Sequence, residues 1–270
     1  MPKDVNKPLI IAHRGASALA PENTLAAFQK AIDDGAEGIE FDVRLAGDGV
    51  PVVFHDPTLG RLGNMAGKVS SYSSADLQRI DVGSWFNLEN PEKADSRFSR
   101  ETIPTLEKLF DFLKGYRGLI YVEMKCRSEE IPTLVRAVGE LIGKTDLLPQ
   151  VIVKSFKLEA VALTKESFPE VYTASLFAPK ILNVLHKRKH LLNKAEECRA
   201  DEISLHYSLA TRKLVRRARQ RGLPTTIWTA DNPRWVKRAF NLDINAIITN
   251  NPARLLAERR DFSSNGSSLI

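Results

Sequence analysis

Two acidic residues stand in one strand-like segment, and a third follows in a later segment of the same kind. Glu40 and Asp42 lie two residues apart in GIEFDVR, and Glu123 lies in LIYVEMK. Alternate residues of a β-strand face the same side, so the first two carboxylates point together. Since apolar residues flank both segments, burial would make unpaired charges costly. We therefore expect Glu40, Asp42 and Glu123 to hold a divalent cation, Mg²⁺ or Ca²⁺, rather than to form exposed salt bridges.

Two cationic residues accompany these acids. Arg14 directly follows a strand-like run, and Lys125 lies two residues after Glu123 on the same expected strand face. Three carboxylates with one divalent cation keep one negative charge, which these two side chains would more than balance. A net positive site suits an anionic phosphodiester, whose oxygens accept charge-assisted hydrogen bonds. We therefore expect Arg14 and Lys125 to bind a phosphate group.

Two histidines complete the set of candidate residues. His13 ends the run LIIAH, and His55 ends the run VPVVFH. A lone histidine at such a position is more often a packed structural residue. Two imidazoles that face each other across a metal site can instead serve as base and acid near neutral pH. We predict catalytic roles for both histidines. The residues alone do not show which of them is the base and which is the acid.

Nine short apolar or β-branched runs, most of them separated by amphipathic segments, organise the chain. They are residues 9–13, 38–44, 50–55, 118–125, 150–156, 171–177, 202–206, 225–229 and 246–249. Only LAGDG separates the second run from the third, so these two must pair as an antiparallel hairpin. Without the returning arm, eight strands remain, and 270 residues is close to the usual size of a TIM (β/α)₈ barrel. In that fold the active site lies at the carboxyl ends of the strands.

The pattern predicts one barrel domain over residues 1–260. Its first helix follows Asn23, a plausible cap, because Leu25, Phe28 and Ile32 recur at helical spacing. Residues 57–103 are rich in Gly, Ser, Asn and charge, which predicts a loop-like insertion that shapes substrate choice. Residues 261–270 have no core-forming pattern and are predicted to be a disordered tail.

The composition excludes several classes of protein. Hydrophobic residues make up 43% of the chain, yet no apolar run exceeds four residues. A membrane span needs about 20 and a signal peptide about 7 to 15. Cys126 and Cys198 are too few for a disulfide framework or a thiolate metal site. We therefore expect a cytoplasmic protein without stable membrane association, and nothing in the sequence specifies its oligomeric state.

Positive charge is concentrated in one predicted helix. The net charge is +6, and residues 211–221, TRKLVRRARQR, form the densest basic stretch. Leu214, Val215 and Ala218 would face the core beneath a cationic outer face. Binding of nucleic acid or another anionic polymer is the alternative function, which a steep loss of affinity with salt would reveal. No aromatic residue interleaves these arginines, so we expect no nucleic-acid partner.

The order of these motifs resembles that of the glycerophosphodiester phosphodiesterase family. Residues 11–56 contain HRG, PENT, an E-x-D strand, a DG turn and VV-x-HD in the family's order. Further on, IPTLEKLFDFL, IYVEMK, VKSF, TTIWT and IITNNP resemble the family's later motifs. The resemblance extends from about Leu9 to Leu256. Five ordered motifs at strand ends are far more specific than a single HRG or HD.

This resemblance implies a TIM-barrel enzyme that hydrolyses glycerophosphodiesters, small-molecule substrates, to sn-glycerol 3-phosphate and an alcohol. The attacking oxygen would be that of water or the glycerol 2-hydroxyl group, and the sequence does not distinguish them. Trp228 would stack on the glycerol or the alcohol. By residue, the resemblance implies that Glu40, Asp42 and Glu123 are metal ligands. It implies that His13 and His55 are the acid and base pair, and that Arg14 and Lys125 contact the phosphate.

Two positions depart from the family's pattern. Ala46 and Gly47 stand where a Thr usually precedes the DG turn, and Asn250 replaces an Asp in the closing motif. Asn250 lacks a negative charge, which puts in doubt an orienting role toward a cationic neighbour.

A second substrate class, lysophospholipids, would make the protein a lysophospholipase D. That activity requires an apolar entrance, whereas the apolar residues of the insertion are scattered and form no long amphipathic helix.

Overall fold

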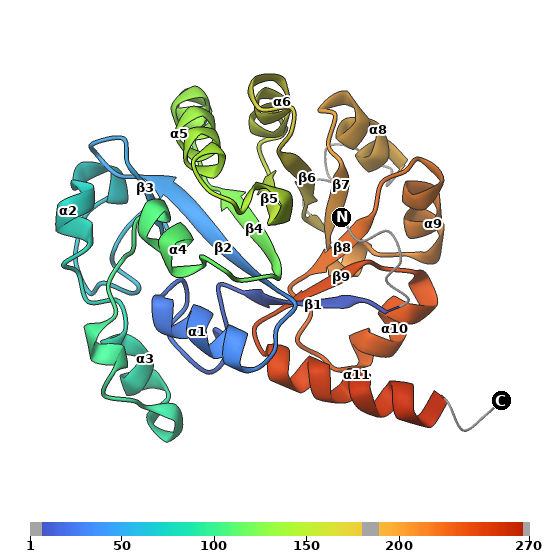
Figure 1. The fold of residues 1–270 in the computed structure, drawn as a ribbon, viewed down its shortest axis with the longest axis horizontal. Coiled ribbons are helices and arrows are strands. Elements are labelled where there is room, and N and C mark those ends of the chain that lie inside the picture. The colour runs from blue at the N-terminus through green and yellow to red at the C-terminus, as the bar shows by residue number, and fades with distance from the viewer. Residues whose placement is uncertain (1–6, 180–188, 267–270) are drawn as a thin grey trace.

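Eight parallel strands form the barrel at the centre of the computed structural model, which describes residues 7–179 and 189–266 (Figure 1). In chain order they are β1 (Leu9–His13), β2 (Gly38–Leu45), β4 (Leu119–Met124), β5 (Val151–Ser155), β6 (Tyr172–Phe177), β7 (Glu202–His206), β8 (Thr225–Trp228) and β9 (Ala246–Thr249). Neighbouring strands pair in this order, and β1 pairs with both β9 and β2, which closes the barrel. The predicted TIM barrel is therefore confirmed.

A ninth strand, β3 (Pro51–Val53), pairs antiparallel with the end of β2. Val43 lies opposite Val53, and Gly49 adopts a φ of 81° in the turn between the strands. Positive φ is readily adopted by glycine, which lacks a Cβ atom. The backbone N–H of Phe54 then donates to the carbonyl oxygen of Asp42 at 3.0 Å. The predicted hairpin is confirmed, and it places His55 beside the inner acidic strand.

Helices cover the outside of the barrel (Figure 1). They are α1 (Leu25–Asp33), α4 (Leu106–Phe112), α5 (Ile131–Gly143), α6 (Leu158–Ser167), α8 (Lys189–Glu197), α9 (Arg212–Gln220), α10 (Arg234–Leu242) and α11 (Pro252–Gly266). Strand β2 is consequently buried on both faces. Phe41 faces outward and packs edge-to-face on Phe28 of α1 at 5.7 Å between ring centroids. Glu40 and Asp42 occupy the opposite, inward face, as strand alternation requires.

The first helix begins one residue later than predicted. Thr24, not Asn23, is the N-cap of α1, because its side chain accepts a hydrogen bond from the Ala27 N–H. Asn23 has a left-handed backbone with a φ of 59°. Its side chain exchanges hydrogen bonds with Asp42, at 3.0 Å from the carboxylate and 3.3 Å from the backbone nitrogen. A tertiary contact with the site therefore takes the place of a capping role.

The insertion, which was predicted to be loop-rich, packs around an apolar core of its own. Short helices α2 (Ser74–Leu77) and α3 (Ser84–Glu89) lie at one side of the barrel (Figure 1). Apolar side chains of the insertion pack under these turns against β3; they include Leu59, Leu62, Val69, Leu77, Ile80 and Val82. Their irregular spacing hides this core in the sequence, because the partners on β3 come from outside the insertion.

The end of the chain also differs from the prediction. Helix α11 continues to Gly266, so residues 261–266 are helical rather than disordered, and residues 267–270 lie outside the described part of the chain. Phe262 packs against Phe240 of α10, with 5.0 Å between ring centroids. This aromatic contact provides a physical reason for the helix to continue past residue 260.

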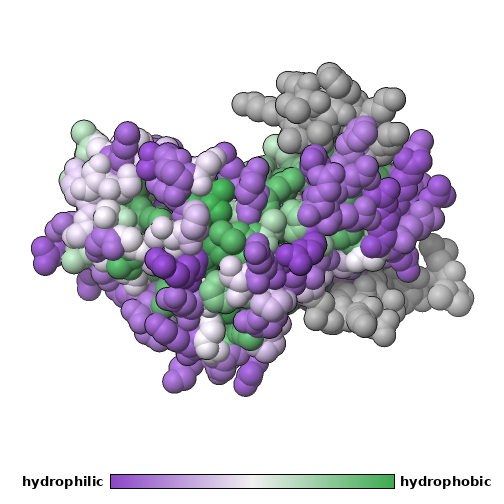
Figure 2. Space-filling view, turned by 90° about the horizontal axis from the view of Figure 1, so that it is seen from above, coloured by the Kyte–Doolittle hydropathy of each residue, from purple (hydrophilic) through white to green (hydrophobic). Residues whose placement is uncertain are grey.

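The outer surface is mostly hydrophilic in the view from above, with hydrophobic residues gathered toward its middle (Figure 2). In α9, Leu214, Val215 and Ala218 are buried beneath the basic face, as predicted. Among the described residues, no helix combines the length and the apolar composition needed to cross a membrane.

Candidate active site

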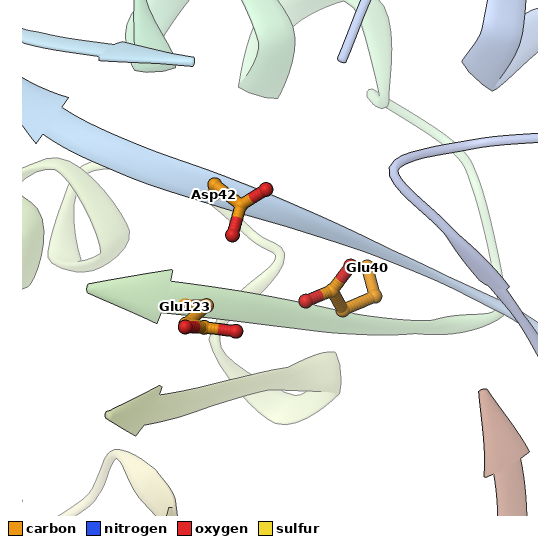
Figure 3. A group of neighbouring side chains, drawn as sticks. All are labelled: Glu40, Asp42 and Glu123. Carbon is orange, nitrogen blue, oxygen red and sulfur yellow. The ribbon is translucent and has the colours of Figure 1, made fainter. Parts of the chain in front are cut away.

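Three buried carboxylates converge inside the barrel, toward the carboxyl ends of β2 and β4 (Figure 3). Asp42 pairs in register with Glu123 on the neighbouring strand, and Glu40 occupies the preceding inward position of β2. One oxygen from each carboxylate lies within 4.8 Å of the corresponding oxygens of the other two. Their exposed fractions are 0% for Glu40 and Asp42 and 5% for Glu123. The structure thus brings the three predicted metal ligands together.

This donor set fits a hard divalent cation. In each carboxylate, one buried oxygen accepts no hydrogen bond from any described residue: Oε1 of Glu40, Oδ1 of Asp42 and Oε1 of Glu123. Ammonium groups contact these oxygens only in ion-pair geometry, at 2.8 Å for Lys154 to Glu40 and 3.3 Å for Lys125 to Asp42. Mg²⁺ and Ca²⁺ prefer carboxylate oxygens of this kind.

Arg14 and Lys125, the predicted phosphate ligands, contact the two oxygens of Asp42. Nε of Arg14 lies 3.1 Å from Oδ2, and Nζ of Lys125 lies 3.3 Å from Oδ1. Nη1 of Arg14 donates to Glu22 at 2.7 Å. Its Nη2 atom makes no hydrogen bond with a residue in the described ranges, so this nitrogen is available to an anionic ligand.

Lys154 is a third cation at the cluster, and it was not predicted from the sequence. Its Nζ atom lies 2.8 Å from Glu40 and 3.8 Å from Glu123, and its side chain is only 2% exposed. The available signal was a lysine inside the apolar run VIVKS, paired in register with Glu123. The three carboxylates are therefore matched by three cations before any metal binds.

Burial and these cations act in opposite directions on the carboxyl pKa values. Burial alone would raise the pKa of Asp42, but Lys125 and Arg14, with smaller contributions from the two histidines, together outweigh burial, and the pKa lies well below its usual range. At Glu40 burial is again the largest single effect, but Lys154 and His13 together overcome it and lower the pKa. At Glu123 burial prevails, and the pKa is raised. Glu123 is consequently the carboxylate whose ionised form has most to gain from a bound cation.

His13 lies at the end of β1, next to the carboxylate cluster. Its Nδ1 atom is 2.7 Å from Oδ1 of Asn250, and its Nε2 atom is 3.9 Å from Oε2 of Glu40. Burial lowers the pKa of His13 by more than Glu40 raises it. Asn250 therefore retains an orienting contact to this histidine, although it lacks the charge of the family's Asp.

His55 has a charged partner instead. Its Nδ1 atom lies 2.7 Å from Oδ1 of Asp56. Burial lowers the pKa of His55, against the effect of Asp42. Both histidines act electrostatically on Asp42, which places them around the same carboxylate. The two predicted catalytic histidines thus lie at one site but have different partners.

Arg61 of the insertion connects the partners of His55 and Arg14. Its Nε atom donates to Oδ2 of Asp56 at 2.5 Å, and its two terminal nitrogens donate to Glu22 at 3.0 and 2.8 Å. Neither Arg61 nor Glu22 was predicted from the sequence to have a role. Glu22 stands in the PENT motif, which was a usable signal, whereas nothing around Arg61 distinguishes it from a surface arginine.

Aromatic residues line the mouth of the barrel at β5, β7 and β8. Trp228 packs edge-to-face on Phe156 and on His206, with 5.4 and 5.5 Å between ring centroids. Phe156 is 42% exposed, and Nζ of Lys125 lies 5.6 Å from its ring centroid. The Nε1 atom of Trp228 is buried and donates to no described residue. Trp228 therefore ends β8, as predicted, and contacts Phe156, the ring that lies near Lys125.

A comparison with known families matches residues 13–254 to the glycerophosphoryl diester phosphodiesterase family. This chain belongs to that family. A glycerophosphodiester phosphodiesterase of Caldanaerobacter subterraneus is 30% identical over 252 residues, covering 93% of this chain and 97% of the relative. A phosphodiesterase of the same name from Bacillus subtilis is 30% identical over 251 residues, covering 90% and 84%. The predicted family and enzyme class are confirmed.

Solved structures of this phosphodiesterase family share the fold. A phosphodiesterase of Oleispira antarctica, in complex with the product sn-glycerol 3-phosphate, matches with a TM-score of 0.81 and 26% identity, covering 93% of this chain and 96% of that one. A glycerophosphodiester phosphodiesterase of Agrobacterium tumefaciens matches with a TM-score of 0.76 and 26% identity, covering 93% and 99%. The carboxylate cluster, the flanking cations and both histidines all fall within the matched family region.

Proposed function

We propose that this phosphodiesterase hydrolyses glycerophosphodiesters to sn-glycerol 3-phosphate and an alcohol, using a divalent cation and two histidines. The observation that carries the proposal is the convergence of Glu40, Asp42 and Glu123 inside one barrel, with cations and imidazoles around them. The product bound by the related Oleispira antarctica enzyme supports the choice of substrate.

The three carboxylates hold the cation, either Mg²⁺ or Ca²⁺. When bound, that cation supplies positive charge that stabilises the phosphoryl oxygens in the transition state. Arg14 and Lys125, which contact the two oxygens of Asp42, bind the phosphate through charge-assisted hydrogen bonds. Trp228 packs its ring against the glycerol or the alcohol.

The two histidines move the protons of the reaction. One imidazole takes the proton of the attacking oxygen, and the other gives a proton to the alcohol oxygen as its bond to phosphorus breaks. If water attacks, one step completes hydrolysis. If the glycerol 2-hydroxyl attacks, a cyclic phosphate forms and water then opens it to sn-glycerol 3-phosphate. Each Nδ1 atom is held by a side chain, so each Nε2 atom is the one that exchanges the proton.

The purified protein tests this proposal with a panel of diesters and an enzymatic assay for released sn-glycerol 3-phosphate. We expect release from glycerophosphoglycerol or glycerophosphoethanolamine, loss of release in excess EDTA, and recovery with Mg²⁺ or Ca²⁺. Full release in exhaustive chelator would exclude the metal requirement. Release of lysophosphatidic acid from lysophosphatidylcholine, without turnover of the soluble diesters, would instead identify a lysophospholipase D.

A further inference from the structure

A cavity of about 120 Å³ lies beside the carboxylate cluster, where β2, the insertion and the loop after β4 meet. We call it the basic pocket. Four cationic side chains and one acidic side chain line it: Arg44, Lys68, Lys125, Arg127 and Glu130. A volume of this size accommodates a carboxylate or a phosphate group but not a large organic ligand. The pocket therefore combines an excess of positive charge with the dimensions of a small anion.

The basic pocket adjoins the proposed phosphate position through a shared residue. Lys125 lines the pocket and also pairs with Asp42. Arg44 follows Asp42 by two residues in β2, so both side chains leave the same face of the strand. The backbone N–H of Lys125 donates to Val43 at 2.9 Å, which aligns Arg44 and Lys125 on neighbouring strands. A group bonded to the phosphate can therefore enter the pocket.

Two of the four cations, Arg44 and Lys68, form no salt bridge in the part of the chain that the structure describes. Arg127 pairs with Glu130 at 2.8 Å, and Lys125 pairs with the carboxylate cluster. Arg44 instead donates to the backbone oxygen of His55 at 2.7 Å. Lys68 is exposed at the rim. A partly buried cation that forms no salt bridge favours an anion supplied by a ligand.

The other side of the mouth offers a different environment. Phe156, Trp228 and His206 form an aromatic surface there, and the ammonium of Lys125 separates it from the basic pocket. The carbon face of a neutral glycerol suits aromatic rings. A glycerol placed in the basic pocket would instead leave Arg44 and Lys68 without an anionic group to bind. The two arms of a diester extend from the phosphate in different directions. With glycerol on the rings, the alcohol extends toward the basic pocket.

We infer that the basic pocket binds an anionic group, a carboxylate or a phosphate monoester, on the leaving alcohol. This inference rests on the proposed function and specifies its substrate class. The enzyme then prefers glycerophosphodiesters of acidic alcohols to those of neutral or cationic alcohols. No additional chemical step is involved, because the pocket only binds the part of the substrate that departs.

A matched set of substrates tests this preference. In glycerophosphoglycerate the leaving alcohol carries a carboxylate where glycerophosphoglycerol carries a hydroxymethyl group. A third diester carries a phosphate monoester there, and glycerophosphoethanolamine carries an ammonium. We expect kcat/KM to be about tenfold higher for at least one anionic diester than for the neutral one. The carboxylate and phosphate arms identify which anion fits. Equal values for all four, or the highest value for ethanolamine, would overturn the inference.

Charge substitutions then locate the effect. Lys68→Glu should remove the preference for the anionic diester while turnover of glycerophosphoglycerol stays within about twofold, and Lys68→Gln should give an intermediate result. Lys93→Glu is the matched control, because it makes the same charge change elsewhere in the insertion. Circular dichroism checks that each variant is folded. If Lys68→Glu lowers turnover of all diesters equally, or Lys93→Glu acts like it, the pocket is not the cause.

A binding measurement separates this inference from the proposed function. Calorimetry with Mg²⁺ and a His13→Ala, His55→Ala double variant measures affinity for the same diesters without fast turnover. Tighter binding of an anionic diester, lost on adding Lys68→Glu, supports the pocket even if the wild-type enzyme hydrolyses none of the panel. Failure of the wild-type enzyme to hydrolyse any diester of the panel would overturn only the proposed function. Equal affinities would overturn the pocket even if every diester is hydrolysed.

Discussion

The Nδ1 atom of His13 lies 2.7 Å from Oδ1 of Asn250, so a neutral amide rather than a carboxylate orients this histidine. The amide is itself held in one orientation. Its nitrogen donates to Asp231 at 2.7 Å, and its oxygen accepts from Ser17 at 2.9 Å. Nδ1 of His13 must then carry a hydrogen. The other ring nitrogen, Nε2, faces Glu40 and is the one left to exchange a proton.

We predict that Asn250→Asp raises the pKa of His13 by about one unit, because it places a negative charge beside Nδ1. A base must be neutral to act, so the acidic limb of the pH profile of kcat/KM moves to higher pH if His13 is the base. An acid must be protonated, so the alkaline limb moves up if His13 is the acid. An active, folded variant with both limbs unchanged would contradict the orienting contact.

The two histidines can be separated by the leaving group. His13→Ala and His55→Ala should each lower kcat on a natural diester by about 10²- to 10⁴-fold, with little change in substrate affinity. A nitrophenyl diester needs no proton on departure. The variant that lacks the general acid should therefore recover on that substrate, and the variant that lacks the base should stay slow. Equal recovery of both variants, or of neither, would argue against this division of roles.

Lys154 should stabilise the fold most when no metal is bound. Replacing it with Met leaves Glu40 buried without its 2.8 Å partner, and loss of one member of a buried pair costs about 3–5 kcal/mol. We expect thermal unfolding of Lys154→Met in EDTA to shift to a markedly lower temperature. Added Mg²⁺ or Ca²⁺ should recover more stability than in the wild type, because the like charge near the cation is gone.

The control for this experiment is Lys165→Met. It breaks an ion pair of 3.0 Å with Asp201, which is not one of the cluster's acids. Its stability loss should be the same with and without metal. A metal-induced stabilisation of Lys154→Met equal to or smaller than that of the wild type would show that Lys154 does not act as the counterion of the carboxylate cluster.

Arg61 is expected to position His55 through Asp56. Arg61→Leu removes all three contacts to Asp56 and Glu22, and loss of such supporting contacts typically lowers activity by about 10- to 100-fold. We expect the loss mainly in kcat, with partial recovery in Arg61→Lys, which can reach one of the two acids. Steady-state kinetics at several substrate concentrations would show this. A change confined to KM would indicate that Arg61 acts through Arg14 instead.

Glu202 should make stability depend on pH. Burial raises its pKa from 4.5 to about 7, and Tyr121 donates to its carboxyl at 3.3 Å. The folded state therefore binds the proton more tightly than the unfolded state. Stability is lost as the pH rises from about 4.5 through about 7, in total by about 3 kcal/mol. Glu202→Gln keeps a neutral side chain of the same shape.

This variant should equal the wild type near pH 5 and exceed it in unfolding free energy near pH 8.5. Chemical denaturation at both pH values measures the difference. A variant that is less stable than the wild type at the higher pH would mean that Glu202 is ionised in the folded protein and that a cation such as Lys154 compensates its charge.

Interactions between near neighbours in the chain account for what sequence reasoning predicted correctly. All nine strands follow from short apolar runs, and the hairpin follows from the five residues between two of them. Glu40 and Asp42 share a face because strand residues alternate. The prediction that Asn23 caps the first helix was wrong, although the helix does begin next to this residue. A cap and a long-range hydrogen bond use the same side chain, and only the fold determined that Asp42 was within reach.

The sequence by itself determined the barrel, its hairpin and the concentration of charge at the ends of particular strands, because strand periodicity and loop length are local properties. The tertiary structure alone decided which side chains meet there. His13 and Asn250 are 237 positions apart, and Arg61 and Glu22 are 39 apart. Lys154 reaches Glu40 only because β5 pairs with β4, which pairs with β2. Such pairings depend on how the strands close in space, which spacing along the chain does not encode.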